Sequence, residues 1–448
     1  MYIRSRREFL KDTLASITAL GAVGSMAKFG EMNALAAGSG YQALVCVFLL
    51  GGNDGHNTVI PITTAQQNYN LYQQNRGGLA LPVNTLLPIA NGSDTYGLHP
   101  SLVEIQGLYN QGKAAVLANV GMLVQPITRA VYLTNNGALV PSALFSHSDQ
   151  SSQWQTGIPS GTGSSGWGGR ITDLLQPQNA GAIFPPMTAT NSCQLFCTGV
   201  QTFPATVPPT GMATLASLSS ASANNGMQQL LTFDNGVQLV QAANGIMTRG
   251  NNYANTLTGL LTGVNLQTPF PAGNPLAAQL QTVARVMAVR NQLGLTRQIF
   301  FCMLDGFDTH SAQLETQTPL LQQLSQAVLA FYQATQELGI DGSVTTFTAS
   351  EFGRTLTPSG NDGSDHAWGS HHFIIGSGVQ GGKFYGNFPL LAPGGNNDAN
   401  NRGVLIPTTA VDQYGSTLAQ WFGVAPASLP TVFPNIANFG TSPLGFLG

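Results

Sequence analysis

Residues 43–58, ALVCVFLLGGNDGHNT, consist of an unbroken apolar run followed by a glycine-rich polar loop. The length and β-branched content of the run predict a strand buried on both faces, the kind found in parallel sheets. In open α/β sheets the ligand site lies beyond the carboxyl ends of such strands, and Asp54 and His56 follow at that position. Asn-Asp-Gly is also a favourable turn sequence. A turn or helix-cap carboxylate is therefore an equal alternative to a functional role for Asp54.

The same order of strand, polar loop and helix recurs along the chain. Further buried strands are expected near residues 114–120, 298–304, 344–349 and 373–375, and amphipathic helices near 101–111, 276–293 and 320–338. This alternation predicts an α/β fold with a mostly parallel sheet flanked by helices. Residues 158–275 break the pattern, because Gly, Ser, Thr, Asn and Pro dominate there and charges are few. We expect this region to be a long irregular or helical insertion, used as a cap over the site or as a surface for partners.

Residues 1–37 have the features of a twin-arginine signal peptide rather than of a surface amphipathic helix. SRREFLK at residues 5–11 matches the twin-arginine pattern, a moderately apolar run follows at 14–26, and residues 34–36 offer a small-x-small cleavage site. The apolar run is too short and too rich in glycine for a stable membrane span, which needs about 20 residues. We expect a periplasmic or extracellular protein whose residues 38–448 form a single domain.

Charge is scarce in this chain. Charged residues make up 8% of it, and the formal net charge is −3. This lack of a basic field argues against nucleic acid as a partner. Cys46 and Cys302 lie within apolar runs and are expected to be buried thiols. Cys193 and Cys197 are expected to form a disulfide in an oxidising compartment rather than a metal site, because no second Cys or His pair accompanies them.

The histidines indicate where chemistry is expected. All seven belong to strand-end or loop segments outside residues 158–275: His56, His99, His147, His310, His366, His371 and His372. Taken singly, each is better explained as a structural or surface histidine. Together with Asp54, Asp308, Glu351 and Asp365, they form a set of carboxylates and imidazoles suited to Zn²⁺, Mn²⁺ or Mg²⁺ with open positions for substrate.

Two segments concentrate these groups. Residues 345–386 hold Glu351, Arg354, Asp362, Asp365 and three of the histidines.

Residues 145–150, FSHSDQ, offer His147 and Asp149 as ligands or acid–base groups, and Ser146 or Ser148 as a nucleophile. A helix cap is the alternative for this second segment, and we favour it for Ser148 and Asp149. A Ser-His-Asp hydrolase is disfavoured, because no Gly-x-Ser-x-Gly turn is present.

Six ordered motifs, preceded by the twin-arginine leader, give the mature chain a resemblance to a known family. It resembles the family catalogued as domain of unknown function 1501 through VCVFLLGGNDGHNTVIP, LHPSL, LFSHSDQ, LDGFDTHS, SEFGRT and DHAWGSHHFIIGSGVQGGKFYG. That family is similar to the alkaline phosphatase and sulfatase superfamily, whose fold is an α/β sheet with metal ligands at strand ends. The resemblance therefore implies an alkaline-phosphatase-like sheet over essentially the whole mature chain.

Carried over position by position, the resemblance also implies metal ligands. They would be Asp54, Asp308, His310, Glu351 and His366. Two departures from the superfamily pattern are clear. Phosphatases have Asp-His where this chain has Glu351-Phe352, which leaves one imidazole to be replaced by His147, His371 or His372. The sulfatase motif Cys/Ser-x-Pro-x-Arg is absent, and Ser146 is the best candidate nucleophile from its position.

Two functions of different classes follow. The first is an exported, metal-dependent hydrolase of phosphate or sulfate esters, in which Arg354 would hold the anionic substrate. Its ligand set would be the five residues above, with Asp365 beside them and His147 as an acid–base group. The alternative is a non-catalytic exported protein on the same scaffold, which binds a surface polymer or a partner through residues 158–275. Ancestry favours the first function, and the incomplete ligand set favours the second.

Overall fold

The computed structural model describes residues 40–134, 139–160, 163–192, 195–212, 221–233 and 236–448. The expected signal peptide lies outside the described residues, as does Cys193, so the Cys193–Cys197 disulfide stays a prediction. Cys46 and Cys302 are buried, as expected. No helix in the described part of the chain is both long and apolar enough to cross a membrane.

A mostly parallel sheet forms the centre of the fold, as predicted. Its middle strand β1 (Gln42–Leu50) pairs in parallel with β8 (Arg297–Asp305) on one side and β9 (Val344–Ala349) on the other. The strand order is β11-β5-β10-β9-β1-β8-β6-β7, with β12 also paired to β5. The other strands are β5 (Ala114–Gly121), β6 (Met187–Ala189), β7 (Ala205–Thr206), β10 (Ser370–Ile375), β11 (Phe384–Tyr385) and β12 (Thr409–Ala410). Among the described strands of this sheet, β10 alone runs antiparallel to its neighbours.

A second, smaller sheet was not expected from the sequence. It has the order β2-β4-β3 and consists of β2 (Val59–Thr63), β3 (Leu87–Asn91) and β4 (Asp94–Leu98). All of its pairs are antiparallel. Its strands contain Pro61, Pro88 and Gly97, which weaken the strand signal in the sequence.

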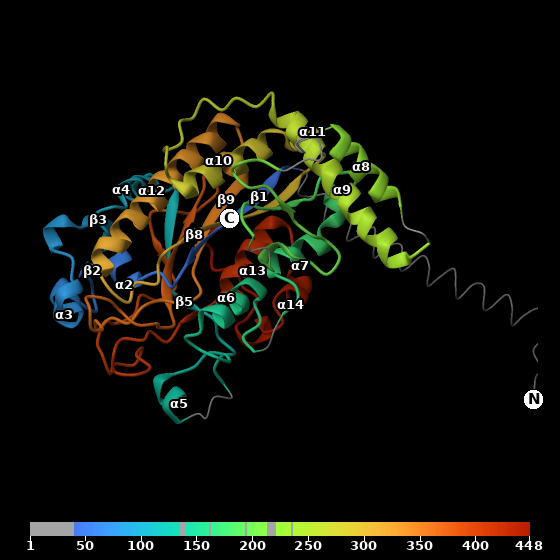
Figure 1. Cartoon of the computed structure of the whole chain (residues 1–448). Coiled ribbons are helices and arrows are strands. Elements are labelled where there is room, and N and C mark those ends of the chain that lie inside the picture. The colour runs from blue at the N-terminus through green and yellow to red at the C-terminus, as the bar shows by residue number, and fades with distance from the viewer. Residues whose placement is uncertain (1–39, 135–138, 161–162, 193–194, 213–220, 234–235) are drawn as a thin grey trace, which may run out of the picture. The chain divides into compact units, whose positions relative to one another are not determined.

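Helices cover both faces of the central sheet (Figure 1). On one face lie α4 (Val103–Asn110), α10 (Pro275–Ala288) and α12 (Gln313–Glu337), and on the other lie α6 (His147–Thr156), α7 (Trp167–Leu174) and α13 (Val411–Phe422). Alternate side chains of β1 point to opposite faces of the sheet, so β1 contributes to the apolar core on each face. Val45 and Val47 belong to the apolar cluster with α10 and α12, whereas Phe48 packs edge-on against Trp154 of α6, with ring centroids 6.3 Å apart.

The three predicted helices are present. The remaining helices outside residues 158–275 are short: α2 (Gly55–Thr58), α3 (Tyr69–Arg76), α5 (Arg129–Thr134), α11 (Arg290–Leu293) and α14 (Leu429–Val432). The main difference from the prediction is at α12, which was expected near residues 320–338. It begins earlier, at Gln313, and contains Pro319. Its extra N-terminal turns bring Gln313 to the polar end of the sheet.

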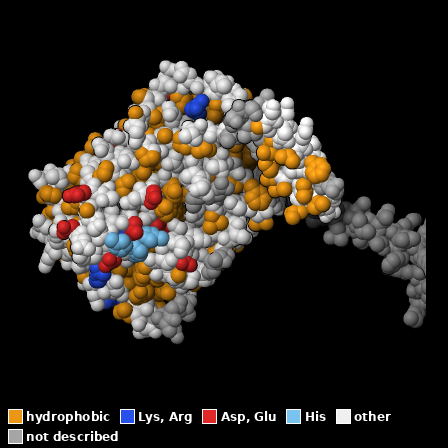
Figure 2. Space-filling view, viewed as in Figure 1, with side chains coloured by type: hydrophobic (Ala, Val, Ile, Leu, Met, Phe, Trp, Pro, Cys, Tyr) orange, Lys and Arg blue, Asp and Glu red, His pale blue; other side chains and the backbone are white. Residues whose placement is uncertain are grey.

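Part of residues 158–275 belongs to the central fold rather than to an insertion. Helix α7 is largely buried, β6 pairs with β8, and β7 pairs with β6 at one end of the sheet. The rest of this region includes α8 (Ala221–Thr232) and α9 (Gln238–Leu261), which pack together. In Figure 2 exposed histidine side chains form a pale-blue patch that is open to view, and the helical pair α8–α9 lies apart from this patch rather than over it.

The ends of β1 and β8 lie so close together that only glycine fits at Gly51. The last residues of the two strands, Leu50 and Asp305, are register partners. Gly51 has φ +117°, and a Cβ atom there would lie 2.3 Å from the backbone nitrogen of Asp308. Gly51 also donates its N–H to Glu351 Oε1 at 2.8 Å. The turn after β1 is thus fixed against the loops that follow β8 and β9.

We expect Gly51→Ala to lower the free energy of unfolding by at least about 2 kcal/mol more than Gly92→Ala, measured by urea denaturation. Both glycines have positive φ, but a Cβ atom at Gly92 would meet nothing within 4 Å. Gly92→Ala therefore measures the cost of a positive φ at alanine without a steric clash. Equal losses for the two variants would contradict the close approach at Gly51.

Candidate metal centre

The chemistry-bearing side chains meet at the carboxyl ends of the central strands. Asp308 and His310 follow β8, Glu351 follows β9, and His366 precedes β10. His147 comes from a different direction, as the first residue of α6. In Figure 2 the exposed histidine side chains form one pale-blue patch surrounded by acidic side chains.

Three imidazoles converge on one carboxylate oxygen. The Nε2 atoms of His147, His310 and His366 lie 3.3, 3.1 and 3.3 Å from Asp308 Oδ1. His366 Nε2 is also 3.0 Å from His147 Nε2 and 2.9 Å from His310 Nε2. Of the described residues, His147, Asp308 and His366 each offer one ligand atom, and these atoms all lie within 4.8 Å of one another.

The Nδ1 atom of each ring, on the side away from Asp308, faces an oxygen atom. His366 Nδ1 lies 2.7 Å from the carbonyl oxygen of Phe145, which can only accept, so Nδ1 carries the proton. His147 Nδ1 lies 2.8 Å from Glu351 Oε1, and His310 Nδ1 lies 3.4 Å from Asp365 Oδ1. A neutral imidazole protonated at Nδ1 has its lone pair at Nε2. In this tautomer the Nε2 lone pairs of the three rings point toward Asp308 and toward one another.

This arrangement fits a divalent cation. Lone pairs about 3 Å apart repel unless a proton or cation lies between them. Two ligand atoms on a tetrahedral zinc, each ~2.0 Å from the ion, are about 3.3 Å apart, close to the distances found here. Imidazole nitrogen favours Zn²⁺ or another transition metal, whereas Mg²⁺ prefers oxygen ligands. The oxygen atoms behind the rings match the outer contacts that orient histidine ligands in metal sites.

The ligand candidates differ in the direction in which their surroundings shift their pKa values. Partial burial acts to raise the pKa of Asp308, but the hydrogen bond and charge of Arg354 outweigh it and lower that pKa to about 2. The hydrogen bond that His147 donates to Glu351 raises the pKa of His147, whereas burial lowers the pKa of His366. Asp308 is thus an anion over the whole physiological range.

Arg354 does not have the substrate-binding role that the sequence suggested. Its side chain is buried, and it donates to the carbonyl oxygens of Gly51, Gly52 and Ser364 and to Asp308 Oδ1. A guanidinium with these contacts has no open face for a substrate anion. Arg354 instead holds Asp308 and the turn after β1 in place.

Glu351 and Asp365 stand behind histidines rather than among the converging atoms. Glu351 is buried and accepts from Gly51 and from His147. Asp365 faces His310 and pairs with Arg402, with Oδ2 2.6 Å from Nη1. Of the six predicted metal ligands, Asp308, His310 and His366 converge, and the Nε2 atom of His147 lies with them.

Asp54 lies outside the cluster, and the helix-cap alternative describes it. Its Oδ1 accepts the backbone N–H of His56 at the start of α2, and its Oδ2 accepts from Arg76 and from Gln313 Nε2. Asp54 and Arg76 are 1% and 0% exposed, so they form a fully buried ion pair. Burial raises the pKa of Asp54, and the Arg76 charge opposes that rise. Its carboxylate is engaged by these three contacts and is not among the converging atoms, which does not match the predicted metal role.

Ser146 does not reach the histidines. It occupies the N-cap position of α6, and its hydroxyl donates to Asp149 Oδ2 at 2.5 Å. A hydroxyl group bound to Asp149 and away from the histidines does not match the nucleophilic role predicted for Ser146. The residue before it, Phe145, has φ +74°, a strained conformation for an aromatic residue. The Phe145 carbonyl that holds His366 had no signal in the sequence, because any residue type offers such an acceptor.

The other histidines are structural. His56, His99, His371 and His372 are all buried. The His371 ring stacks on Phe388 with centroids 4.6 Å apart, and its Nδ1 accepts the N–H of Asn119. Burial lowers the pKa of His371 and of His372 to about 3, so both rings are neutral.

The chain as a whole matches one known family over most of its length. The match covers residues 41–406. The chain belongs to the family described as Protein of unknown function (DUF1501). The family predicted from the six ordered motifs is thereby confirmed, and every converging residue lies within the matched DUF1501 region. No curated protein matches the chain.

Several solved structures are similar to the chain at low identity and low TM-score. The chain is similar to Ps i-CgsB, solved in complex with k-i-k-neocarrahexaose, at 9% identity and a TM-score of 0.36, over 88% of this chain and 77% of that one. It is similar to the lipoteichoic acid synthase LtaP from Listeria monocytogenes at 8% identity and a TM-score of 0.34, over 83% and 76%. It is also similar to the PsFucS1 sulfatase from Pseudoalteromonas sp. at 9% identity and a TM-score of 0.34, over 93% and 75%.

We expect Asp54→Asn to lower the free energy of unfolding by about 3–5 kcal/mol, because it leaves the buried Arg76 charge unpaired. Urea denaturation measures this loss, with Asp305→Asn, which changes an exposed carboxylate at the end of β8, as the control. The folded Asp54→Asn protein should keep its metal content. Loss of metal from a variant of unchanged stability would instead make Asp54 a ligand.

Proposed function

We propose that this protein is a metal-dependent hydrolase of phosphate or sulfate esters, with one divalent ion held by His147, Asp308, His310 and His366. The convergence of three Nε2 atoms on Asp308 Oδ1 carries this proposal. The donor set favours Zn²⁺ over the Mn²⁺ and Mg²⁺ that the sequence left open. His310 and Asp308 are 46% and 49% exposed, so an ester in solution can reach the cluster.

The residues of the chain prepare the site in separate ways. When bound, a divalent ion polarises an ester oxygen and makes water a better nucleophile near neutral pH. Arg354 keeps Asp308 anionic, and Glu351 holds the proton on the Nδ1 atom of His147. Phe145 does the same for His366 through its carbonyl oxygen. These contacts fix ring orientation before any ligand arrives, which reduces the reorganisation that binding and reaction require.

A non-catalytic protein on the same scaffold is the second candidate. The contacts of Ser146 and Arg354 favour it, because the first is hydrogen-bonded to Asp149 and the second is enclosed by carbonyl groups. A hydrolase on this scaffold would therefore use water as its nucleophile and would hold its substrate anion without Arg354.

We expect the protein purified without chelator to contain close to one equivalent of zinc by elemental mass spectrometry. His366→Ala should lose most of this metal, because one of the converging nitrogens is removed and outer contacts cannot replace it. Hydrolysis of aryl phosphates or aryl sulfates should fall with the metal and return when zinc is restored to the wild-type protein after chelation.

Asp305→Asn is the matched control, because it removes a nearby exposed carboxylate and should leave metal content unchanged. Less than about a tenth of an equivalent of any divalent ion in the wild-type protein would overturn the metal site. Full metal content with no ester hydrolysis would overturn the enzyme and leave the non-catalytic candidate.

We further propose that the protein reaches the periplasm or the cell exterior by the twin-arginine route. The motif at residues 5–11 and the scarcity of charge support this assignment. Replacing Arg6 and Arg7 together by Lys should retain the full-length precursor in the cytoplasm, as detected by immunoblotting of cell fractions. Unchanged export of that variant would contradict the proposal.

A further inference from the structure

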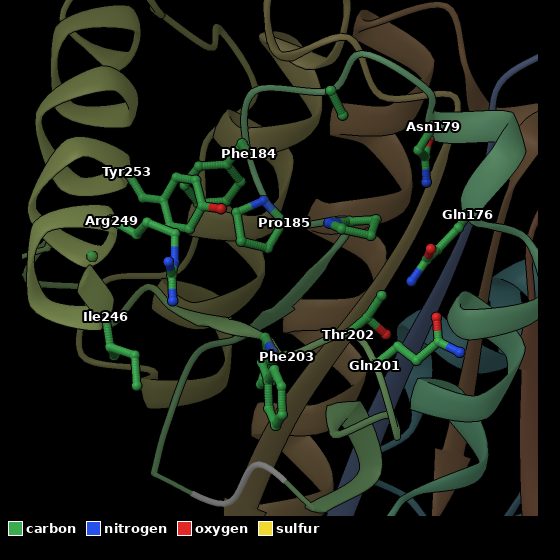
Figure 3. Close-up of a pocket in the computed structure, with 14 residues that line it drawn as sticks. Gln176, Asn179, Phe184, Pro185, Gln201, Thr202, Phe203, Ile246, Arg249 and Tyr253 are labelled. Atoms are coloured by element: carbon green, nitrogen blue, oxygen red, sulfur yellow. The ribbon is translucent and has the colours of Figure 1, made fainter. Parts of the chain in front are cut away.

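A cavity lies at the end of the sheet that carries β7. It has a volume of about 770 Å³ and is bounded by α9 on one side and by the segments around residues 176–186 and 201–204 on the other (Figure 3). This volume is within the range of small-molecule and cofactor sites. None of the residues of the metal centre lines it.

One charged residue faces this cavity. Arg249, on α9, is the one charged side chain among the lining residues. It is exposed, and within the described parts of the chain its guanidinium has no ion-pair or hydrogen-bond partner. In the sequence, Asp234 is the only other charged residue between Asp173 and Arg285. An unpaired cation in a stretch this poor in charge favours a ligand with an anionic group.

The rest of the lining suits a ligand with both hydroxyl groups and apolar faces. Gln176 and Gln201 point into the cavity from the side opposite α9, and their amides can both donate and accept (Figure 3). Phe184 and Tyr253 pack edge to face with centroids 5.6 Å apart. Phe203 is 65% exposed at the cavity, so its ring is accessible to a ligand.

The cavity walls are stiff. Pro185, Pro186 and Pro204 line it, and proline fixes φ near −65°. Pro186 and Pro204 also lie next to the strand segments that extend the central sheet, since β6 begins at Met187 and β7 at Ala205. The backbone of this wall is therefore restricted at these positions before a ligand binds, which lowers the entropic cost of binding.

From these contacts we infer that the cavity binds a segment of an acidic polysaccharide. Arg249 pairs with a carboxylate or sulfate of the polymer, the amides of Gln176 and Gln201 contact its hydroxyl groups, and Phe203 packs against a sugar ring face. The lining excludes a basic partner, because it offers no carboxylate. This inference does not depend on the metal centre or on ester hydrolysis.

Affinity electrophoresis of the mature protein tests the site. The gels contain dextran sulfate, polygalacturonate or hyaluronate, with neutral dextran as the uncharged control. We expect at least one acidic polymer to retard the wild-type protein and neutral dextran to have little effect. Arg249→Gln should weaken the retardation about tenfold or more, the usual effect of removing a charged hydrogen-bond partner, and Phe203→Ala should weaken it several-fold.

Lys383→Gln is the matched control, because it removes one exposed positive charge that does not line the cavity. It should bind like the wild-type protein. The inference is overturned if no acidic polymer binds, or if Arg249→Gln and Lys383→Gln weaken binding equally. It is also overturned if light scattering shows that Arg249→Gln or Phe203→Ala breaks a dimer, since a second copy would then be the occupant. Metal content, measured on the same samples, separates this outcome from failure of the metal centre.

Discussion

The buried guanidinium of Arg354 is the interaction on which the site depends. It contacts the turn after β1, the loop after β8 and the segment before β10, through Gly51, Gly52, Asp308 and Ser364. A buried charge is costly unless its hydrogen bonds are satisfied, so the loop conformations that satisfy Arg354 are strongly preferred. These contacts hold the turn after β1, the loop after β8 and the segment before β10 in one arrangement. Arg354 serves the cluster by fixing its geometry, although it presents no surface to a substrate.

The charges around the cluster also favour a cation. Asp308, Glu351 and Asp365 contact the three rings, and Arg354 and Arg402 contact these carboxylates. Three carboxylates against two guanidinium groups leave an excess of one acidic group beside the imidazoles. In a chain with so few charges this concentration is not a general surface property. The same scarcity distinguishes Arg249, whose guanidinium lines the cavity beside α9 and has no partner among the described residues.

The sequence predicted the sheet better than the site. Long apolar runs such as residues 43–50 and 298–304 predict buried strands directly, whereas the short strands of the small sheet are interrupted by Pro and Gly. His310, His366 and Asp308 were expected at strand ends and do converge. Asp54 could not be assigned, because its partners Arg76 and Gln313 lie 22 and 259 residues away and give no local signal. The same is true of Arg354, whose carbonyl partners belong to the backbone and have no signature in side-chain type.

The strained turn at Phe145 has a consequence for how the site can vary. Its carbonyl oxygen fixes the ring of His366, and two residues later the chain supplies the ring of His147. The positions of the two imidazoles therefore both depend on this turn, although the residues are 219 positions apart in the sequence. A conformational change in this turn would move both rings at once, so His147 and His366 would enter or leave the centre together, whereas Asp308 and His310 belong to the loop after β8.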